Sequence, residues 1–425
     1  MATTRMGGEA GHAGEVSPMS PSGYSDALDW FRYLRENCPV HLDEEGRYVL
    51  TRYDDVYAAL RNEPEVWSSA HVLLNADHLL ANARWIPYAD DPEHLELRRV
   101  VNRGWTPTAV AELEPSLRAS LAEALSSIEP DAEFDVYPLG CRYITQSFGD
   151  AVGLPPEQRR RLDLWTTVSM SFARPREQRA PARRDPGPNV SVAPEFEAGY
   201  RDMEAYFTSL IDDHKDHEPG FCKDVEGLPP FPRAIVKAIK DRPADLDVFL
   251  RRIYPPMHLG GMSTVTHIFS NVVAVLLEHP QAWAMLQEDR SLIAVDEPSE
   301  VVEEILRLRS SHAGLHKRPQ QDIDVRGTVI PKGSMVQLYY VSADRDPDVF
   351  EAPDEFKLRG LSRHLAFGFG THTCMGQSFV RLAIKIFLEG LLDKFSHLEC
   401  GSTAPDWSFS GTYFTPPTML VVGRQ

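Results

Sequence analysis

Residues 367–376 read Phe-Gly-Phe-Gly-Thr-His-Thr-Cys-Met-Gly and place one cysteine, Cys374, in a loop that is rich in glycine. Glycines at positions 368, 370 and 376 permit backbone conformations and close approaches that a side chain would block. A flat macrocycle can therefore lie against this loop. The pattern predicts that Cys374 is held rigidly beneath such a ring.

The apolar run that follows, residues 377–392, predicts a helix. Backbone amides at its start can point toward the Cys374 sulfur, stabilise its anionic form and lower the thiol pKa. A thiolate held in this way is suited to be the axial ligand of a haem iron. The alternative for a lone cysteine is a buried free thiol that packs as a small hydrophobic group. The glycine pattern around Cys374 favours the ligand.

Residues 367–376 also fit Phe-x-x-Gly-x-His-x-Cys-x-Gly, which closely resembles the haem-binding signature of the cytochrome P-450 family. The resemblance implies a mostly α fold with a small β region, haem b ligated by Cys374, and dioxygen as co-substrate. It also implies that Phe367, Gly368 and Gly376 contact the haem.

Glu304 and Arg307 are three residues apart, so on a helix they share a face and can form a charge-assisted pair. The pair resembles the Glu-x-x-Arg element of the family, and residues 342–359 resemble its meander. The resemblance implies that Arg359 joins Glu304 and Arg307 in a network that holds the haem-side core. Read alone, the pair is an ordinary surface ion pair.

His94 and Arg98 are one helical turn apart and resemble the His-x-x-x-Arg element, whose two side chains reach one haem propionate. Read alone, this spacing also fits a solvated basic helix face. His372 is the third propionate candidate. Either Lys317 or Arg318 is the fourth, and Lys317 would bind without the bidentate fork of an arginine.

Residues 258–265 precede a long apolar helix and resemble the distal oxygen-binding helix of the family. Gly260 and Gly261 match its small pair, which lets the helix open locally, and Thr264 matches the hydroxyl that relays protons. Ser263 stands where the family has an acid. Read alone, these residues are glycine and hydroxyl groups tolerated in a buried helix.

The missing acid at Ser263 bears on the reaction, because a carboxylate can bring protons from solvent whereas a hydroxyl only passes on what water supplies. The hypothesis that follows is either ordinary hydroxylation through a water chain or a different oxidation, such as oxidative coupling or nitration. The sequence does not choose between them.

The resemblance also implies where the substrate lies. The candidate pocket residues are Asn75, Asn82, Arg84, Trp85, Met170, Phe172, Met257, Gly260, His312, Leu315 and Phe414. For each of them a packing role is an alternative. Residues 174–184 carry five arginines and form either an entrance loop that favours an anionic substrate group or a plain solvated loop.

Composition restricts the class of protein. The chain has 425 residues, with 44 basic and 62 acidic side chains, for a net charge of −18. This charge argues against nucleic-acid binding and against adsorption to anionic membranes. Its five cysteines form no paired framework or zinc pattern, which indicates a reducing compartment and a cytoplasmic location. We expect neither a membrane span nor a signal peptide.

Helical periodicity recurs over 115–128, 157–172, 195–214 and 244–252, and strand-like alternation over 47–50, 336–340 and 419–422. We expect residues 1–24 to be disordered and residues 25–425 to form a single catalytic domain. The resemblance implies a monomeric monooxygenase that oxidises a medium-sized organic molecule, with electrons from a ferredoxin and its reductase.

Three alternatives stay open. The first is a haem-thiolate enzyme that is driven by peroxide or performs non-hydroxylating chemistry. The second is a haem protein that binds a ligand without turnover, for which Ser263 is the one hint. The third is a metal site that begins at His372 and Cys374, for which the sequence offers no second ligand pair.

Overall fold

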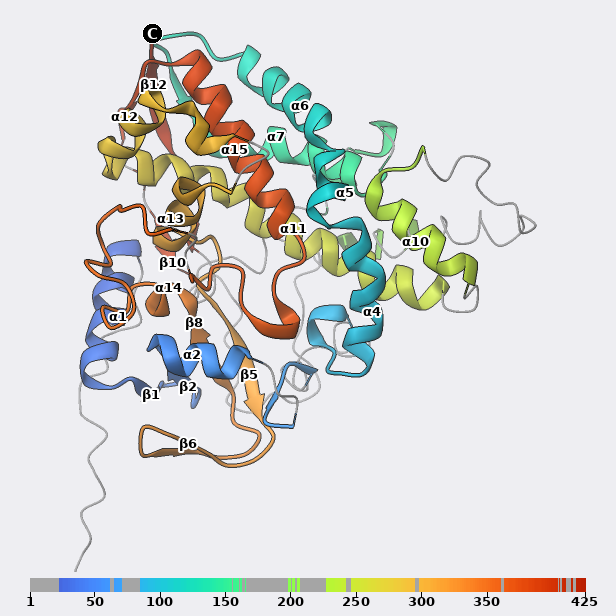
Figure 1. Cartoon of the computed structure of the whole chain (residues 1–425), viewed down its shortest axis with the longest axis vertical. Coiled ribbons are helices and arrows are strands. Elements are labelled where there is room, and N and C mark those ends of the chain that lie inside the picture. The colour runs from blue at the N-terminus through green and yellow to red at the C-terminus, as the bar shows by residue number, and fades with distance from the viewer. Residues whose placement is uncertain are drawn as a thin grey trace, which may run out of the picture.

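The computed structural model describes residues 23–61, 65–70, 85–154, 227–241, 246–294, 298–360, 363–403 and 418–425, with short pieces between 156 and 206 and between 405 and 415. A helical body surrounds one long central helix, and a small sheet lies to one side of it (Figure 1). The family fold expected from the sequence, mostly α with a small β region, agrees with this arrangement.

The helices of the described residues have the following bounds. They are α1 (Tyr24–Asn37), α2 (Tyr53–Leu60), α4 (Glu93–Val101), α5 (Pro107–Ala111), α6 (Glu114–Ser126), α7 (Val136–Ala151), α10 (Pro230–Asp241), α11 (Leu246–Glu278), α12 (Pro280–Glu288), α13 (Glu300–Leu308), α14 (Tyr340–Ala343) and α15 (Gln377–Lys394). Short 3-10 turns are η2 (Ile86–Tyr88), η3 (Asn102–Gly104), η4 (Pro156–Gln158), η7 (Arg290–Ile293) and η8 (Gly370–His372).

The strands form small sheets. They are β1 (Val40–Leu42), β2 (Tyr48–Leu50), β3 (Trp67–Ser68), β4 (Glu133–Asp135), β5 (Gly314–Pro319), β6 (Ile323–Val325), β7 (Thr328–Ile330), β8 (Val336–Tyr339), β9 (His397–Cys400), β10 (Ser408–Phe409), β11 (Phe414–Thr415) and β12 (Leu420–Arg424). The largest has the order β1-β2-β8-β5-β3, in which only β2 and β8 are parallel. A second sheet has the order β4-β12-β9.

The central helix α11 forms because its apolar side chains are buried. Phe269 and Val272 are fully buried, and the Phe269 ring packs on Tyr143 of α7 with centroids 5.1 Å apart. The predicted helical segment 244–252 is confirmed from residue 246 onward as the start of α11, which runs without a break through Pro255 and Pro256. Proline removes one backbone donor, and burial of the apolar face offsets that loss.

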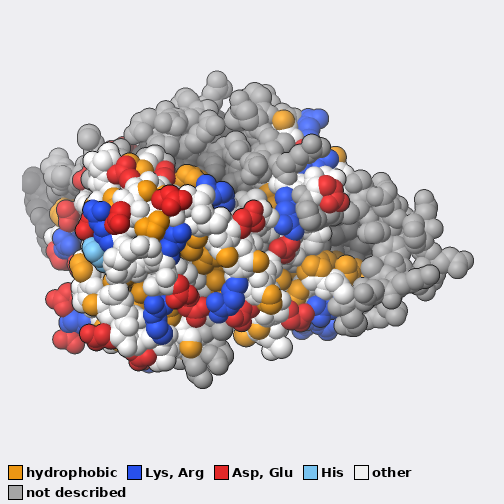
Figure 2. Space-filling view, turned by 90° about the horizontal axis from the view of Figure 1, so that it is seen from above, with side chains coloured by type: hydrophobic (Ala, Val, Ile, Leu, Met, Phe, Trp, Pro, Cys, Tyr) orange, Lys and Arg blue, Asp and Glu red, His pale blue; other side chains and the backbone are white. Residues whose placement is uncertain are grey.

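By length and composition alone, the part of α11 from Pro256 to Glu278 could cross a membrane. Of its most apolar window, 81 % is buried inside the fold, as expected for a core helix. On the face of the molecule shown in Figure 2, acidic and basic side chains of the described residues are interspersed.

Other predicted elements are confirmed where the structure describes them. The predicted helices 115–128 and 377–392 correspond to α6 and α15, and the predicted strands correspond to β2, β8 and β12. The predicted helices 157–172 and 195–214 lie mostly outside the described residues, as do residues 1–22 of the expected disordered segment.

Candidate active site

The Cys374 loop is fixed by its own backbone. The Cys374 N–H donates to the Phe367 carbonyl at 2.8 Å, and the Gly368 N–H donates to Leu365 at 2.7 Å. Gly370 has φ +74°, and a Cβ atom there would lie 2.4 Å from the Leu60 carbonyl oxygen at the end of α2. Glycine is therefore required at this position both for its backbone angle and for the close approach.

The pKa of the Cys374 thiol is raised, which corrects the lowered value expected from the sequence. Desolvation raises it, and the backbone amides of Gly376 and Gln377 with the charges of Arg98 and Arg381 lower it by less. The predicted helix-start amides are thus present, but burial outweighs them. Burial therefore makes Cys374 a poor free nucleophile, whereas a metal ion, when bound, deprotonates a coordinating thiol outright.

Basic side chains from three separate parts of the chain meet beside this loop. The rings of His94 on α4 and His372 stack with centroids 3.8 Å apart. Arg98, one turn after His94, donates a hydrogen bond to the Thr373 carbonyl. Lys317 on β5 is fully buried and close enough to His372 to depress the His372 pKa. The predicted propionate set therefore forms one cluster.

Lys317, and not Arg318, belongs to this cluster. Successive residues of a strand face opposite sides, and the Arg318 guanidinium donates to the Gly333 carbonyl at 2.6 Å, away from the loop. Desolvation lowers the pKa of Lys317 to about 8, although the Asp90 carboxylate raises it.

The cluster fits an anionic group. The Nε2 atom of His372 is buried and has no hydrogen-bond partner among the described residues. Desolvation, followed by the charges of His94, Lys317 and Arg98, lowers the His372 pKa to about 2. Buried cations and donors of this kind are stable when they face a negatively charged partner. The two carboxylates of a haem would provide one.

The Glu304–Arg307 pair lies in the core, so its reading as a surface ion pair is wrong. The two side chains are at most 1 % exposed, and two hydrogen bonds of 2.8 Å join them. Arg359 donates at 3.0 Å to Oε1 of Glu304, the oxygen that also accepts from Nη2 of Arg307. Arg307 also donates to the carbonyls of Asp344 and Pro353. The network thus connects α13 to the segment that precedes the Cys374 loop.

On α11, the Thr264 hydroxyl donates to the Gly260 carbonyl at 2.7 Å. A Cβ atom on Gly260 would meet nothing within 4 Å, whereas one on Gly261 would lie 2.8 Å from the Phe148 ring. Gly261 therefore serves the packing of α11 on α7, and only Gly260 leaves open space beside the helix. The side chain of Ser263 lies outside the described residues.

The substrate-pocket candidates are described only in part. Trp85 and Met257 are buried and Leu315 is half-buried. Desolvation lowers the pKa of His312 to about 4, so its ring is neutral at pH 7. Outside the described residues lie Asn75, Asn82, Arg84, Met170, Phe172, the side chain of Phe414 and the arginine-rich segment 174–184.

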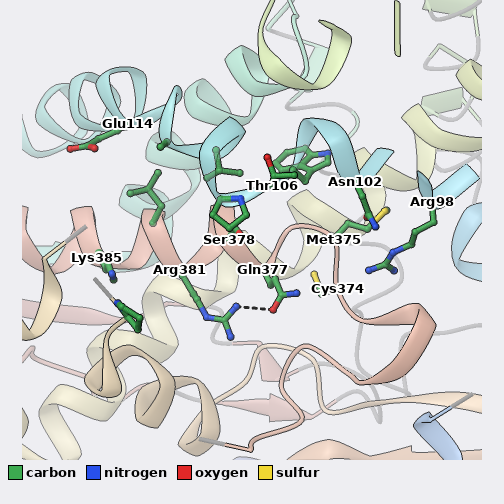
Figure 3. A pocket seen from close by; sticks show the side chains of 16 residues that line it. Arg98, Asn102, Thr106, Glu114, Cys374, Met375, Gln377, Ser378, Arg381 and Lys385 are labelled. Carbon is green, nitrogen blue, oxygen red and sulfur yellow. Dashed lines mark hydrogen bonds between the residues drawn. The ribbon is translucent and has the colours of Figure 1, made fainter. Parts of the chain in front are cut away.

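A groove of about 730 Å³ lies between α15 and the segment that runs from α4 to α5, and Cys374 is among the residues that line it (Figure 3). Arg381 and Lys385 of α15 line it together with Arg98 and Glu114. Arg381 and Lys385 are not among the residues predicted from the sequence. The available signal is their i, i+4 spacing after Gln377, which marks one polar stripe on an otherwise apolar helix.

The described residues contain no group of three or more His, Cys, Asp or Glu side chains that could hold a metal ion. The alternative metal site that would begin at His372 and Cys374 thus gains no further ligands within the described part of the chain.

Comparisons with known proteins agree with this geometry. The family model described as Cytochrome P450 matches residues 250–421. The chain is 26 % identical to the erythromycin C-12 hydroxylase of Saccharopolyspora erythraea, over 87 % of each chain. It is 28 % identical to the cyclomarin C epoxidase CymV of Salinispora arenicola, over 89 % of this chain and 91 % of that one.

Solved structures have the same fold. A mutant of P450 EryK in complex with erythromycin B has a TM-score of 0.78 at 24 % identity, covering 94 % of this chain and 97 % of that one. Ligand-free cytochrome P450 TbtJ1 has a TM-score of 0.76 at 25 % identity, covering 96 % and 100 %.

Proposed function

Because this chain belongs to the cytochrome P450 family and is a monooxygenase of the bacterial type, we propose that Cys374 is the axial ligand of its haem and that the substrate is a medium-sized organic molecule of secondary metabolism. The observation that carries the proposal is the meeting of Cys374 with a buried basic cluster at one end of the same loop. Haem, when bound, supplies the binding and reductive activation of dioxygen.

Four side chains hold the two haem carboxylates in this proposal. Arg98 and Lys317 supply two positive charges, which match the two negative charges of the propionates. His94 and His372 are neutral and act as N–H donors, because desolvation lowers the pKa of both rings. Phe367, Gly368 and Gly376 shape the loop beneath the ring.

Thr264 and Ser263 handle protons in this proposal. The Thr264 hydroxyl proton is engaged with the Gly260 carbonyl, so its oxygen lone pairs are available to accept from water. Gly260 leaves space for that water beside α11. Ser263 can pass a proton along but cannot supply one at neutral pH, so protons reach the site through water.

Electrons come from a ferredoxin and its reductase in this proposal. Arg99 and Arg103 are exposed at the end of α4 and in η3, beside the groove that leads to Cys374. They suit an acidic partner, because complementary charge steers association. Arg98, one position earlier on α4, donates to the Thr373 carbonyl and faces the loop instead. We further propose a cytoplasmic monomer.

The relatives named above act on erythromycin and on cyclomarin C, as their names state. Erythromycin and cyclomarin C are therefore the first compounds to screen. Product formation with hydrogen peroxide alone, without ferredoxin, would instead identify the peroxide-driven alternative.

The test of the proposed ligand is the absorption spectrum after dithionite reduction and exposure to carbon monoxide. Wild-type protein and a Cys400→Ser control should both give the red-shifted Soret band of a thiolate complex, since Cys400 is exposed on β9. Cys374→Ser should lose this band. A histidine-type band in the wild type, or the same band in Cys374→Ser, overturns the assignment.

A further inference from the structure

Arg381 lies on α15, about one helical turn after its first residue, Gln377, and its orientation is fixed by a single carboxylate. Its Nε and Nη2 atoms donate to the two oxygens of Glu303 on α13 at 2.6 and 2.8 Å. This bidentate geometry holds a guanidinium in one orientation. Glu303 adjoins Glu304 in sequence but has its own partners.

Glu303 is ionised, and a second side chain besides Arg381 donates a hydrogen bond to its carboxylate. Desolvation alone would raise its pKa, but hydrogen bonds from Arg381 and His364 lower it from 4.5 to about 2. The Ala366 N–H donates to Nδ1 of His364 at 3.2 Å, so the ring proton is on Nε2, which donates to Glu303 at 3.0 Å. His364 thus ties the carboxylate to the segment just before the Cys374 loop.

The clamped guanidinium contacts the loop at two points. Its Cζ atom lies 4.5 Å from the centre of the Phe367 ring, and the Phe367 carbonyl accepts the Cys374 N–H at 2.8 Å. Its Nη1 atom donates to the Gln377 side chain at 2.8 Å (Figure 3), and the Gln377 backbone amide faces the Cys374 sulfur. Arg381 therefore touches the residues that hold the cysteine on both sides.

The charge of Arg381 also acts on the sulfur directly. It is among the groups that lower the pKa of the Cys374 thiol, and both residues line the same groove. A fixed positive charge stabilises the added electron when a nearby metal centre is reduced, and a fixed negative charge has the opposite effect.

We propose that Arg381, held by Glu303 and His364, is the positioning residue of the Cys374 loop and that its charge raises the reduction potential of the iron bound to Cys374. This inference rests on the proposed function in one respect, namely that Cys374 is the axial ligand. Charges and hydrogen bonds beside the ligand sulfur change the reduction potential of a haem–thiolate centre.

The test measures the ferric/ferrous midpoint potential of substrate-free holoprotein in a mediator titration. Arg381→Gln should shift the potential to more negative values, because a cation is lost and Glu303 is left uncompensated. Glu303→Gln should shift it to more positive values, because an anion is lost. Arg381→Lys keeps the positive charge and should therefore have the wild-type potential, although it loses the bidentate geometry of the guanidinium. A shift of 59 mV corresponds to a tenfold change in the one-electron equilibrium constant.

The matched controls are Arg47→Gln and Asp43→Asn. Arg47 is 30 % exposed, against 31 % for Arg381, and it also pairs with a carboxylate, on Asp43. Its hydrogen bonds lie in the β1–β2 hairpin, so both controls should keep the wild-type potential.

Opposite shifts in Arg381→Gln and Glu303→Gln, with unchanged controls, support the proposal. Shifts of the same sign in the two variants overturn it, because they indicate that breaking the pair merely loosens the loop. Equal potentials in all variants also overturn it. The carbon monoxide spectrum of the wild type, recorded on the same samples, distinguishes these failures from failure of the Cys374 assignment. If single variants fold poorly, the double variant Arg381→Gln/Glu303→Gln should give a potential between those of the singles.

Discussion

The rings of His94 and His372 stack with centroids 3.8 Å apart and planes inclined by 25°. The first residue comes from α4 and the second from the loop of Cys374, so this contact joins segments that are almost 280 positions apart in sequence. Two imidazolium ions would repel each other at this distance, and the pKa of both rings is lowered. The pair therefore offers neutral donors beside the charges of Arg98 and Lys317.

Replacing His372 by Phe should preserve the stack on His94 while it removes the buried Nε2 donor. We expect haem loss to an acceptor protein to become faster by roughly tenfold, which corresponds to about 1.4 kcal/mol for a hydrogen bond to a carboxylate. The control is His397→Phe, since His397 is 53 % exposed and pairs with Glu399. Equal rates of haem loss for wild type and His372→Phe would show that His372 does not bind a propionate.

Replacing Ser263 by Asp should increase the share of reducing equivalents that reaches product, because a carboxylate restores a proton donor on α11. The measurement compares product formed with electrons consumed for a substrate found in the screen. Ser263→Ala is the matched variant, and it should couple no better than wild type. Unchanged coupling in Ser263→Asp would show that the identity of this residue does not limit protonation.

Replacing Glu304 by Gln should destabilise the fold strongly, because Arg307 and Arg359 would lose a shared buried carboxylate. Removing one partner of a buried pair costs about 3–5 kcal/mol. The exposed pair of Arg290 and Asp393 provides the control, and Arg290→Ala should cost less than about 1 kcal/mol. Urea unfolding monitored by circular dichroism measures both. Equal midpoints for the two variants would contradict the prediction.

Glu303 should make stability depend on pH in acid. Its folded pKa, about 2, is below the ordinary value of 4.5, so its contribution is complete above pH 4.5 and is lost as the pH falls toward 2. The shift of about 2.5 pH units corresponds to at most about 3–4 kcal/mol, at roughly 1.4 kcal/mol per pH unit. Urea unfolding at pH 6 and pH 3 should show a larger loss for wild type than for Glu303→Gln. Equal losses of stability in wild type and Glu303→Gln would contradict the low pKa of Glu303.

Replacing Gly370 by Ala should cost more than replacing Gly360, although both glycines have positive φ, +74° and +72°. At Gly360 nothing lies within 4 Å of the new Cβ, so only the backbone strain of about 1–2 kcal/mol applies. At Gly370 the Cβ meets the Leu60 and Arg61 carbonyls, which adds about 1–3 kcal/mol of overpacking. Thermal unfolding and haem content measure the difference. Equal costs would mean that α2 moves away from the loop easily.

Features with a local pattern could be predicted from the sequence. The Cys374 loop, the Glu304–Arg307 spacing and helices α6 and α15 each depend on residues within one or two turns of each other. Arg359 was placed with Glu304 correctly because the family resemblance connected them.

Features that depend on distant contacts could not be predicted in this way. The choice between Lys317 and Arg318 depends on which face of β5 turns inward, and pairing with β8 sets that face. The clamp on Arg381 requires α13 beside α15. The sequence predicts that Gly261 lets α11 open locally, because nothing in the sequence shows that the Phe148 ring packs against it. The thiol pKa depends on burial, which the loop sequence does not reveal.

The strand β12 pairs with β4 on one side and with β9 on the other, and the Asp135 carboxylate accepts the Met419 N–H. Residues 133–135 therefore cannot form this strand pair until the ribosome has added almost 290 further residues. At about 5–20 residues per second, that interval is roughly 15–60 s. During this time α7, which begins at Val136, lacks the strand that closes the sheet at its start. This sheet therefore closes only when synthesis reaches β12.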